Sequence, residues 1–423
     1  MHSNLQDIIL GSITGDALGA PLDGMGEKHI RSVFKSVNGY IDPMPALKGK
    51  PDRWKKPGLY TANTQLLLFL SVALSGEKIC RSDMLENLFT SIADSGESPA
   101  GQLRHPTGTI IQAFRKIENA EGQTTSHFTS GDILPLLPAL LVLKKTDEES
   151  FITSVTSFVS FFSQNPWVLA SSLIISSLYF SIHSSAGAGD LRTVVTDTIE
   201  SANRIENLSE TFSHLIFDSG WNPDTVIDCI RQVRHLLDRI QQSTHTDQAA
   251  QFIVQGINTN QKTPVTRPTV NHPISVLCWP CAYALHIDNI HEYMFRIAET
   301  GGSTSVFVPV AGAIYGMYCG NSMIPSHLIE NLVNRKRILT LVESINSMKV
   351  RRAELDKFMQ NESSLTRKEE EERGSRFKRT PEKKPRKRTK KENVDELSRH
   401  VVESWTKYDK AKWKKQKKKI DTE

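Results

Sequence analysis

The sequence predicts an all-α fold, in which one many-helix domain precedes a basic C-terminal tail. Apolar residues recur at helical spacing through most of the chain, whereas long alternation of Val, Ile and Thr is hard to find. Aromatic residues make up only 7% of the 423 residues, and a hydrophobic content of 38% is enough to form a sizeable core. These observations favour helices over sheets in residues 1–345.

Six apolar segments have the period of core helices and are flanked by Pro, Gly, Asn or Asp. They span residues 66–74, 133–143, 151–162, 168–182, 226–240 and 274–285. Segment 167–182 is the most apolar part of the chain, but it is short for a membrane span and carries five serines. We therefore expect a buried core helix there and no contact with a membrane.

Two runs of glycine share a four-residue spacing. The runs are Gly11, Gly15, Gly19 and Gly312, Gly316, Gly320. On a helix this spacing leaves one face without side chains. Glycine at an interior helix position lowers helix stability by about 1 kcal/mol relative to alanine. We therefore expect these glycines to have a structural role, in which the two helices approach backbone to backbone in the centre of the fold.

The C-terminal part of the chain differs in charge from the rest. Residues 346–423 contain 26 Lys and Arg against 15 Asp and Glu, a net charge of +11, so residues 1–345 carry −6. Highly charged segments cannot bury a core, which predicts a disordered charged linker over residues 346–392. Residues 393–423 combine an amphipathic pattern with basic clusters. The cationic run over residues 383–391, together with this tail, is predicted to contact nucleic acid, and the alternative is a solubilising extension whose short helix docks on the domain.

Three blocks of sequence, in this order, resemble the motifs of the ADP-ribosylglycohydrolase family. Residues 9–25 (ILGSITGDALGAPLDGM) resemble the glycine-striped opening helix, where Asp16 fills the motif aspartate and Asp23 stands where the family usually has glutamate. Residues 58–65 (GLYTANTQ) resemble its T-D-D-T block, and residues 301–306 (GGSTSV) resemble G-G-D-T-D-T. The resemblance covers roughly residues 1–335 and implies an ADP-ribosylglycohydrolase-like helical domain over residues 1–345.

The charged positions of these two later motifs are changed in this chain. Thr61, Thr64 and Thr304 are kept, whereas neutral residues replace all four aspartates. The replacements are Ala62, Asn63, Ser303 and Ser305, and the last threonine of the motif becomes Val306. The resemblance implies a site that cleaves ADP-ribose from proteins with two magnesium ions, yet the matching positions carry no charge.

Magnesium prefers oxygen ligands that usually include carboxylates. Hydroxyl and amide oxygens cannot neutralise two neighbouring dications in a partly dry cleft. We therefore expect no magnesium pair and no other cofactor at the degenerate positions Thr61, Ala62, Asn63, Ser303, Ser305 and Val306. Asp16 and Asp23 could at most support one loosely held ion, and the alternative for Asp16 is a capping or packing role.

The favoured interpretation is a catalytically inactive pseudoenzyme that binds ADP-ribose or a protein partner. Glycines before a helix would leave N–H groups free for a pyrophosphate. The candidate ligand-binding residues are Thr61, Asn63, Thr64, Gly301, Gly302, Ser303, Thr304 and Ser305. An empty, vestigial cleft has equal weight. The alternative function is an active ADP-ribosyl hydrolase with a rewired or single-metal site, in which Asp16 or Asp23 performs acid–base catalysis.

The five cysteines are too few and too scattered for a disulfide framework, which favours a reducing compartment. The N-terminus lacks the pattern of a secretory signal peptide. We therefore expect a cytoplasmic protein, or a nuclear one if the source is eukaryotic, because the basic run over residues 383–391 would also suit nuclear import. Nothing in the sequence indicates an oligomeric state.

Overall fold

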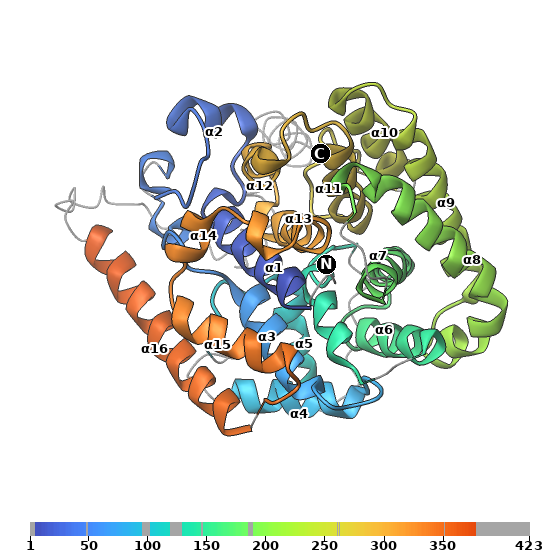
Figure 1. The fold of residues 1–423 in the computed structure, drawn as a ribbon, viewed down its shortest axis with the longest axis horizontal. Helices are drawn as coiled ribbons and strands as arrows, with labels where there is room; N and C mark the ends of the chain where they lie inside the picture. Colours follow the sequence, from blue (N-terminus) through green and yellow to red (C-terminus); the bar gives the residue numbers. More distant parts are fainter. Residues whose placement is uncertain are drawn as a thin grey trace, which may run out of the picture. The chain divides into compact units, whose positions relative to one another are not determined.

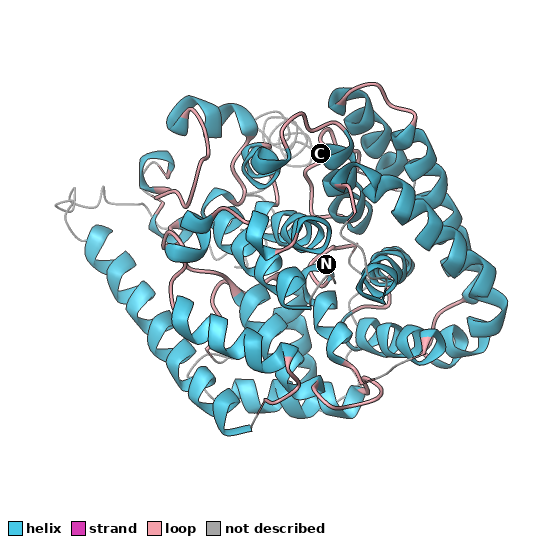
Figure 2. Cartoon of the chain, viewed as in Figure 1, coloured by secondary structure: helices cyan, strands magenta, loops and turns pink. Residues whose placement is uncertain are grey.

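The computed structural model describes residues 5–47, 50–94, 102–118, 129–144, 147–184, 189–259, 261, 263–350 and 352–377. Throughout these ranges the regular secondary structure is helical, as Figures 1 and 2 show. An isolated backbone bridge joins Gly26 to Gly301. The predicted all-α fold is therefore confirmed.

The α-helices of the described residues are joined by 3₁₀ helices and by loops of varied length. In chain order they are α1 (Leu5–Gly19), α2 (Glu27–Phe34), α3 (Ala62–Leu74), α4 (Ser82–Ala93), α5 (Gly108–Glu118), α6 (Glu148–Phe162), α7 (Pro166–Ser184), α8 (Val194–Asp218), α9 (Pro223–Gln241), α10 (Thr246–Asn258), α11 (Pro273–Leu285), α12 (Tyr293–Glu299), α13 (Thr304–Cys319), α14 (Ser326–Glu330), α15 (Arg335–Asn346) and α16 (Arg352–Phe377). The 3₁₀ helices are η1 (Ala20–Leu22), η2 (Met44–Ala46), η3 (Pro51–Arg53), η4 (Leu134–Val142), η5 (Leu191–Thr193), η6 (Ile290–Glu292) and η7 (Asn321–Met323).

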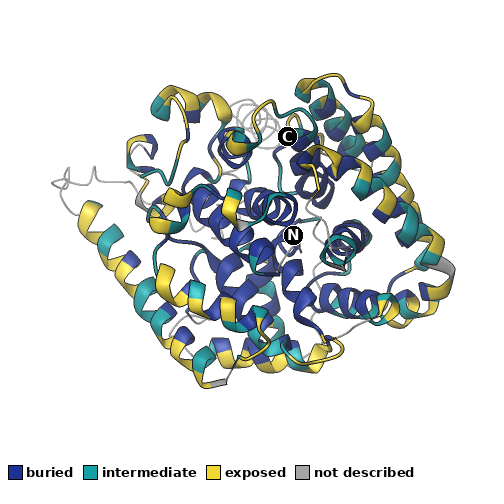
Figure 3. Cartoon of the chain, in the orientation of Figure 1, coloured by how far each residue is buried: buried dark blue, intermediate teal, exposed yellow. Residues whose placement is uncertain are grey.

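Helices α1 and α13 form the central pair, and Figure 3 shows both buried from end to end. A Cβ atom on Gly11 would lie 2.1 Å from the carbonyl oxygen of Gly312, and one on Gly15 would lie 2.4 Å from that of Val308. The predicted approach of the two glycine-striped helices is thus confirmed. Gly320 plays a different part, because it follows the last residue of α13 with a φ of +76°.

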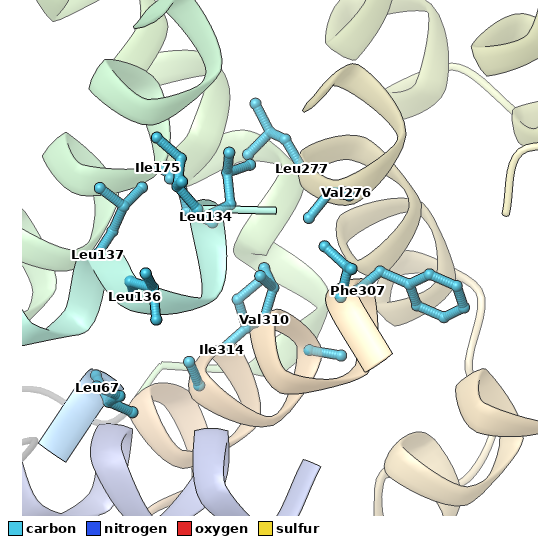
Figure 4. Close-up of a cluster of buried hydrophobic side chains, with 14 of the residues drawn as sticks. Leu67, Leu134, Leu136, Leu137, Ile175, Val276, Leu277, Phe307, Val310 and Ile314 are labelled. Atoms are coloured by element: carbon cyan, nitrogen blue, oxygen red, sulfur yellow. The ribbon is translucent and has the colours of Figure 1, made fainter. Parts of the chain in front are cut away.

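The core surrounds this pair with side chains from four further elements. Figure 4 shows Leu67 of α3, Leu134 of η4, Ile175 of α7 and Leu277 of α11 in one buried cluster with Val310 of α13. All five are at most 1% exposed. Burial of this kind contributes about 25 cal/mol for each Å² of apolar surface, so the centre of the domain supplies much of its stability.

Five of the six predicted core helices lie within α3, α6, α7, α9 and α11. The sixth, predicted over residues 133–143, is instead the 3₁₀ helix η4. Pro135 lies at the start of the helix, where no amide hydrogen is needed, whereas Pro138 lies inside it and lacks the amide hydrogen that an α-helix would use there, which favours the tighter form. Helix α7 is long and apolar enough to cross a membrane by composition alone, but 67% of residues 166–183 are buried inside the domain.

The predicted linker over residues 346–392 is wrong for residues 352–377, which form the long helix α16. This helix packs on α3 and η3, and the compact unit extends to Phe377 instead of residue 345. Glu362 is 0% exposed and Glu369 is 3% exposed, although both belong to a strongly charged segment. Residues 378–392 of the linker and the tail over 393–423 lie outside the described residues.

Glu362 anchors α16 through a buried network. Its carboxylate lies 2.5 Å from the guanidinium of Arg104, which is 2% exposed. Tyr60 donates to Glu362 Oε1 at 2.6 Å and Gln65 donates to Oε2 at 3.1 Å. The prediction of a linker was based on charge composition alone. Composition does not reveal hydrogen-bond and ion-pair partners, and such partners allow a carboxylate to be buried.

Candidate functional site

The three sequence blocks meet where the first turns of α3 and α13 lie side by side. Asn63 Nδ2 donates to the carbonyl oxygen of Ser305 at 2.7 Å, which joins the two turns. The amide of Ser305 donates to Asp23 Oδ1 at 3.3 Å, and the amide of Gly24 donates to the carbonyl of Gly302 at 2.8 Å. Residues from positions 23, 63 and 305 therefore form one site.

Asp16 lies beneath this site as a buried cap for α3. Its two carboxylate oxygens accept hydrogen bonds from the amide and hydroxyl groups of Thr61 and Thr64, at distances of 2.7–3.1 Å. It is 0% exposed. Burial raises the pKa of Asp16 above its usual range, although the hydrogen bonds from Thr64 and Thr61 oppose that rise. Its acceptor positions are used within the fold, which gives it the capping role and not a surface role in acid–base chemistry.

Asp16→Ala should lower the free energy of unfolding by about 3 kcal/mol, because it leaves several buried donors of Thr61 and Thr64 unpaired. Urea denaturation followed by circular dichroism measures the change. The matched control is Asp147→Ala, which removes the exposed cap of α6 and should cost about 1 kcal/mol. A variant at position 16 as stable as the unmodified protein would contradict the capping role.

The turn at Gly301 and Gly302 does not present free N–H groups, so the pyrophosphate contact predicted there is wrong for these residues. The amide of Gly301 donates to the carbonyl of Ala298, and that of Gly302 to the carbonyl of Met25. The amide of Ser303 donates to the carbonyl of Thr269. Both glycines have positive φ, and a Cβ on Gly302 would lie 2.0 Å from the carbonyl oxygen of Thr269. The pattern serves a tight turn that supports the loop 24–26.

Other motif residues are also engaged within the fold. The Thr304 hydroxyl donates to the carbonyl of Gly19 at 2.8 Å, and the amide of Ala62 donates to the carbonyl of Arg104 at 2.7 Å. Val306 is 2% exposed and belongs to the core. Asn63 differs from these residues, because its Oδ1 atom is buried and has no hydrogen-bond partner within the described ranges.

Asp23 is the accessible carboxylate of the site, with a side chain that is 33% exposed. Lys55 Nζ lies 3.4 Å from Asp23 Oδ2, and the lysine side chain is only 13% exposed. The ammonium group therefore already compensates the charge of Asp23. Lys55 lies two residues after the end of η3, and helix α16 packs against η3.

A cleft of about 320 Å³ opens beside Asp23. Its wall includes the cationic side chains of Lys50 and Arg53, and Asp23 is the single carboxylate among its described lining residues. The remaining lining residues are Gly24, Met25, Gly26, His29, Ala46 and Leu47. With Lys55 paired to Asp23, the cleft carries excess positive charge and is suited to an anion.

The oxygen atoms of the motif site, which joins positions 23, 63 and 305, do not match the needs of a magnesium pair. Asp16 has its oxygens occupied and Asp23 faces an ammonium group, so the site holds no carboxylate that is both accessible and unpaired. Among the described residues, no group of three or more His, Cys, Asp or Glu side chains could hold a metal ion. The remaining donors are the neutral side chains of Asn63, Ser303 and Ser305.

Sequence reasoning missed Lys55 and the two other cations of this wall. Their signal is the basic segment 50–56 (KPDRWKK), which immediately precedes the block at residues 58–65. It also missed the network of Tyr60, Gln65 and Arg104, because their partner Glu362 lies between 258 and 302 positions away. Lys50, Arg53 and Lys55 lie outside the motif blocks, and so do Arg104 and Glu362, the partners that explain the burial of Tyr60 and Gln65.

Comparison with known proteins identifies a matching family and a similar fold. A family model described as ADP-ribosylglycohydrolase matches residues 1–354. A solved structure, described as an ADP-ribosylglycohydrolase-related protein complex, is 15% identical and has a TM-score of 0.53. The similarity covers 82% of this chain and 99% of that one, and at this identity it shows the fold alone. No curated protein matches the sequence. Helix α16 lies almost wholly beyond the family match.

Proposed function

Because the chain belongs to the ADP-ribosylglycohydrolase family, we propose that it is an inactive member that binds ADP-ribose without magnesium. The ligand is free ADP-ribose or the same group attached to a protein. The alternative function is hydrolysis at a rewired site. It would have to depend on Asp23, because Asp23 is the accessible carboxylate of the described site.

The ion pair between Lys55 and Asp23 is the observation that carries this proposal. A protein-borne cation lies 3.4 Å from the carboxylate that a metal would need. Two dications beside an ammonium group would repel it, and neutral oxygen ligands would not offset that unfavourable electrostatic energy. The wall of the cleft beside Asp23 is thus made cationic by protein side chains and not by metal ions. In this proposal no metal activates a water molecule for hydrolysis.

The same wall supports binding of a diphosphate. Arg53 and Lys50 lie at the cleft, and guanidinium and ammonium groups form strong charge-assisted hydrogen bonds with phosphate oxygens. Asn63 Oδ1 is buried and has no hydrogen-bond partner among the described residues, and in this proposal it accepts from a sugar hydroxyl that enters beside Asp23. Ser305 is 8% exposed beside it. A ligand that combines a diphosphate with ribose hydroxyls uses both features.

Isothermal titration calorimetry of the full chain with ADP-ribose tests the proposal. We expect saturable binding that does not change when magnesium is replaced by EDTA, and that weakens about tenfold in Arg53→Gln through loss of a charge-assisted contact. Lys78→Gln, an exposed lysine outside the cleft, is the matched control and should leave the affinity unchanged.

A parallel assay with mono-ADP-ribosylated arginine and serine substrates separates the two functions. The proposal predicts no release of ADP-ribose with magnesium present. Release that disappears in Asp23→Ala would establish the hydrolase alternative, whereas absence of both binding and release would leave a vestigial cleft and refute the binding proposal.

For the tail over residues 393–423 we propose contact with nucleic acid, in a protein located in the cytoplasm or, in a eukaryote, the nucleus. Its basic clusters and interleaved aromatic residues support electrostatic binding with stacking. Affinity for RNA or DNA should fall steeply as salt rises and be lost when residues 383–423, which include the cationic run over residues 383–391, are deleted. A nearly salt-independent affinity would contradict this assignment.

A further inference from the structure

A larger pocket, of about 590 Å³, lies next to the Asp23 cleft and is lined by different elements. Helices α2, α10 and α11 contribute to its walls, together with the loop at residues 267–269. Gly26 and His29 line both this pocket and the cleft. Its volume falls in the range of pockets that hold small-molecule ligands, roughly 300–1,000 Å³.

The inner part of this pocket is aromatic. The rings of Trp279 and Tyr283 lie 5.6 Å apart at an angle of 69°. Trp279 is 4% exposed and its indole N–H donates to the Thr300 hydroxyl at 3.3 Å, which fixes the ring. Ala250 and Pro268 extend the apolar surface. Such a surface suits a flat ring system.

The rim of the pocket carries uncompensated positive charge. Lys28 and Arg267 form no ion pair with any residue in the described ranges, whereas Arg31 is paired with Glu27 at 2.8 Å. Arg267 Nη1 lies only 3.1 Å from the position of a Cβ atom on Gly26, so the guanidinium group lies over the backbone shared by the two pockets. Asp247 is the one unpaired carboxylate, which leaves a net charge of +1 with histidine neutral.

Tyr283 adds a polar group between the aromatic surface and the rim. Its hydroxyl has no hydrogen-bond partner within the described part of the chain. Burial, together with the nearby charge of Glu299, raises the pKa of Tyr283 to about 12, so the phenol stays protonated and can donate a hydrogen bond at neutral pH. A ligand oxygen is the natural acceptor.

We propose that this pocket binds a purine nucleotide, with the base against Trp279 and Tyr283 and the phosphate beside Arg267 and Lys28. A flat heterocycle needs the aromatic surface, and a phosphate needs the unpaired cations. Neither feature depends on the degenerate motif positions or on Lys55. The inference therefore stands apart from the proposed ADP-ribose cleft, and each can fail without the other.

Isothermal titration calorimetry of the full chain with AMP tests the inference, with adenosine and inorganic phosphate as separate probes. We expect AMP to bind more tightly than either probe and to lose affinity as salt rises. Arg267→Gln should weaken AMP binding roughly tenfold, the loss of one charge-assisted contact. Because Arg267 is exposed, this variant should fold, and an unchanged melting temperature verifies that it does.

Two controls locate the binding. Lys78→Gln removes an exposed lysine outside both pockets, and Arg53→Gln alters only the neighbouring cleft. Lys78→Gln should leave AMP affinity unchanged, and Arg53→Gln should weaken it less than Arg267→Gln does. Absence of AMP binding, or binding that Arg53→Gln weakens and Arg267→Gln does not, would overturn the proposed nucleotide pocket.

Discussion

Glu362→Ala is expected to lower the free energy of unfolding by about 3–5 kcal/mol, the usual cost of leaving a buried charge without its partner. Arg104 is enclosed and would lose the carboxylate that lies 2.5 Å from its guanidinium group. Tyr60 and Gln65 would lose an acceptor at the same time. The urea midpoint of the full chain measures the effect.

Two comparisons make this test specific. Glu371→Ala removes an exposed carboxylate of the same helix, 69% exposed in its side chain, and should change stability by less than about 0.5 kcal/mol. Combining Glu362→Leu with Arg104→Met removes both charges and should recover much of the loss. A midpoint for Glu362→Ala equal to that of Glu371→Ala would mean that α16 does not anchor the domain.

Gly312→Ala should destabilise the domain by more than about 3 kcal/mol, at the upper end of overpacking costs. The added methyl group would lie 2.0 Å from the carbonyl oxygen of Gly11. Backbone cannot rotate aside as a side chain can, so α1 and α13 would have to separate. Loss of soluble protein, or a large fall in the melting temperature, is the expected result.

Gly374→Ala is the matched control for this substitution. It also places alanine in a helix, but nothing lies within 4 Å of the new Cβ atom. Alanine has the higher helix propensity, so this variant should be stabilised by about 0.5–1 kcal/mol. Equal melting temperatures for the two variants would contradict the close approach of the central helices.

The central fold was predictable because its constraints are local in the sequence. The four-residue spacing of Gly11 and Gly15, and likewise of Gly312 and Gly316, predicts that each helix has one face without side chains. The form of η4 was also within reach, since Pro135 and Pro138 stand within the apolar run. Helix α16 was not, because the burial of Glu362 depends on an arginine 258 positions earlier.

The site was predictable in its members but not in their roles. The three motif blocks identified Asp23, Asn63 and Ser305, which the structure brings together. Glycine at 301 and 302 indicated an anion site, whereas the backbone there is used to hold the loop 24–26. The role of Lys55 was missed because it lies outside the motifs. Its pairing with Asp23 becomes visible only in the three-dimensional structure.

Titration of the full chain with magnesium, followed by calorimetry, tests most directly whether this cleft can hold metal ions. The charge arrangement around Asp23 and Lys55 predicts no saturable binding, with or without ADP-ribose present. Two saturable magnesium sites per chain, weakened by Asp23→Asn, would contradict the account.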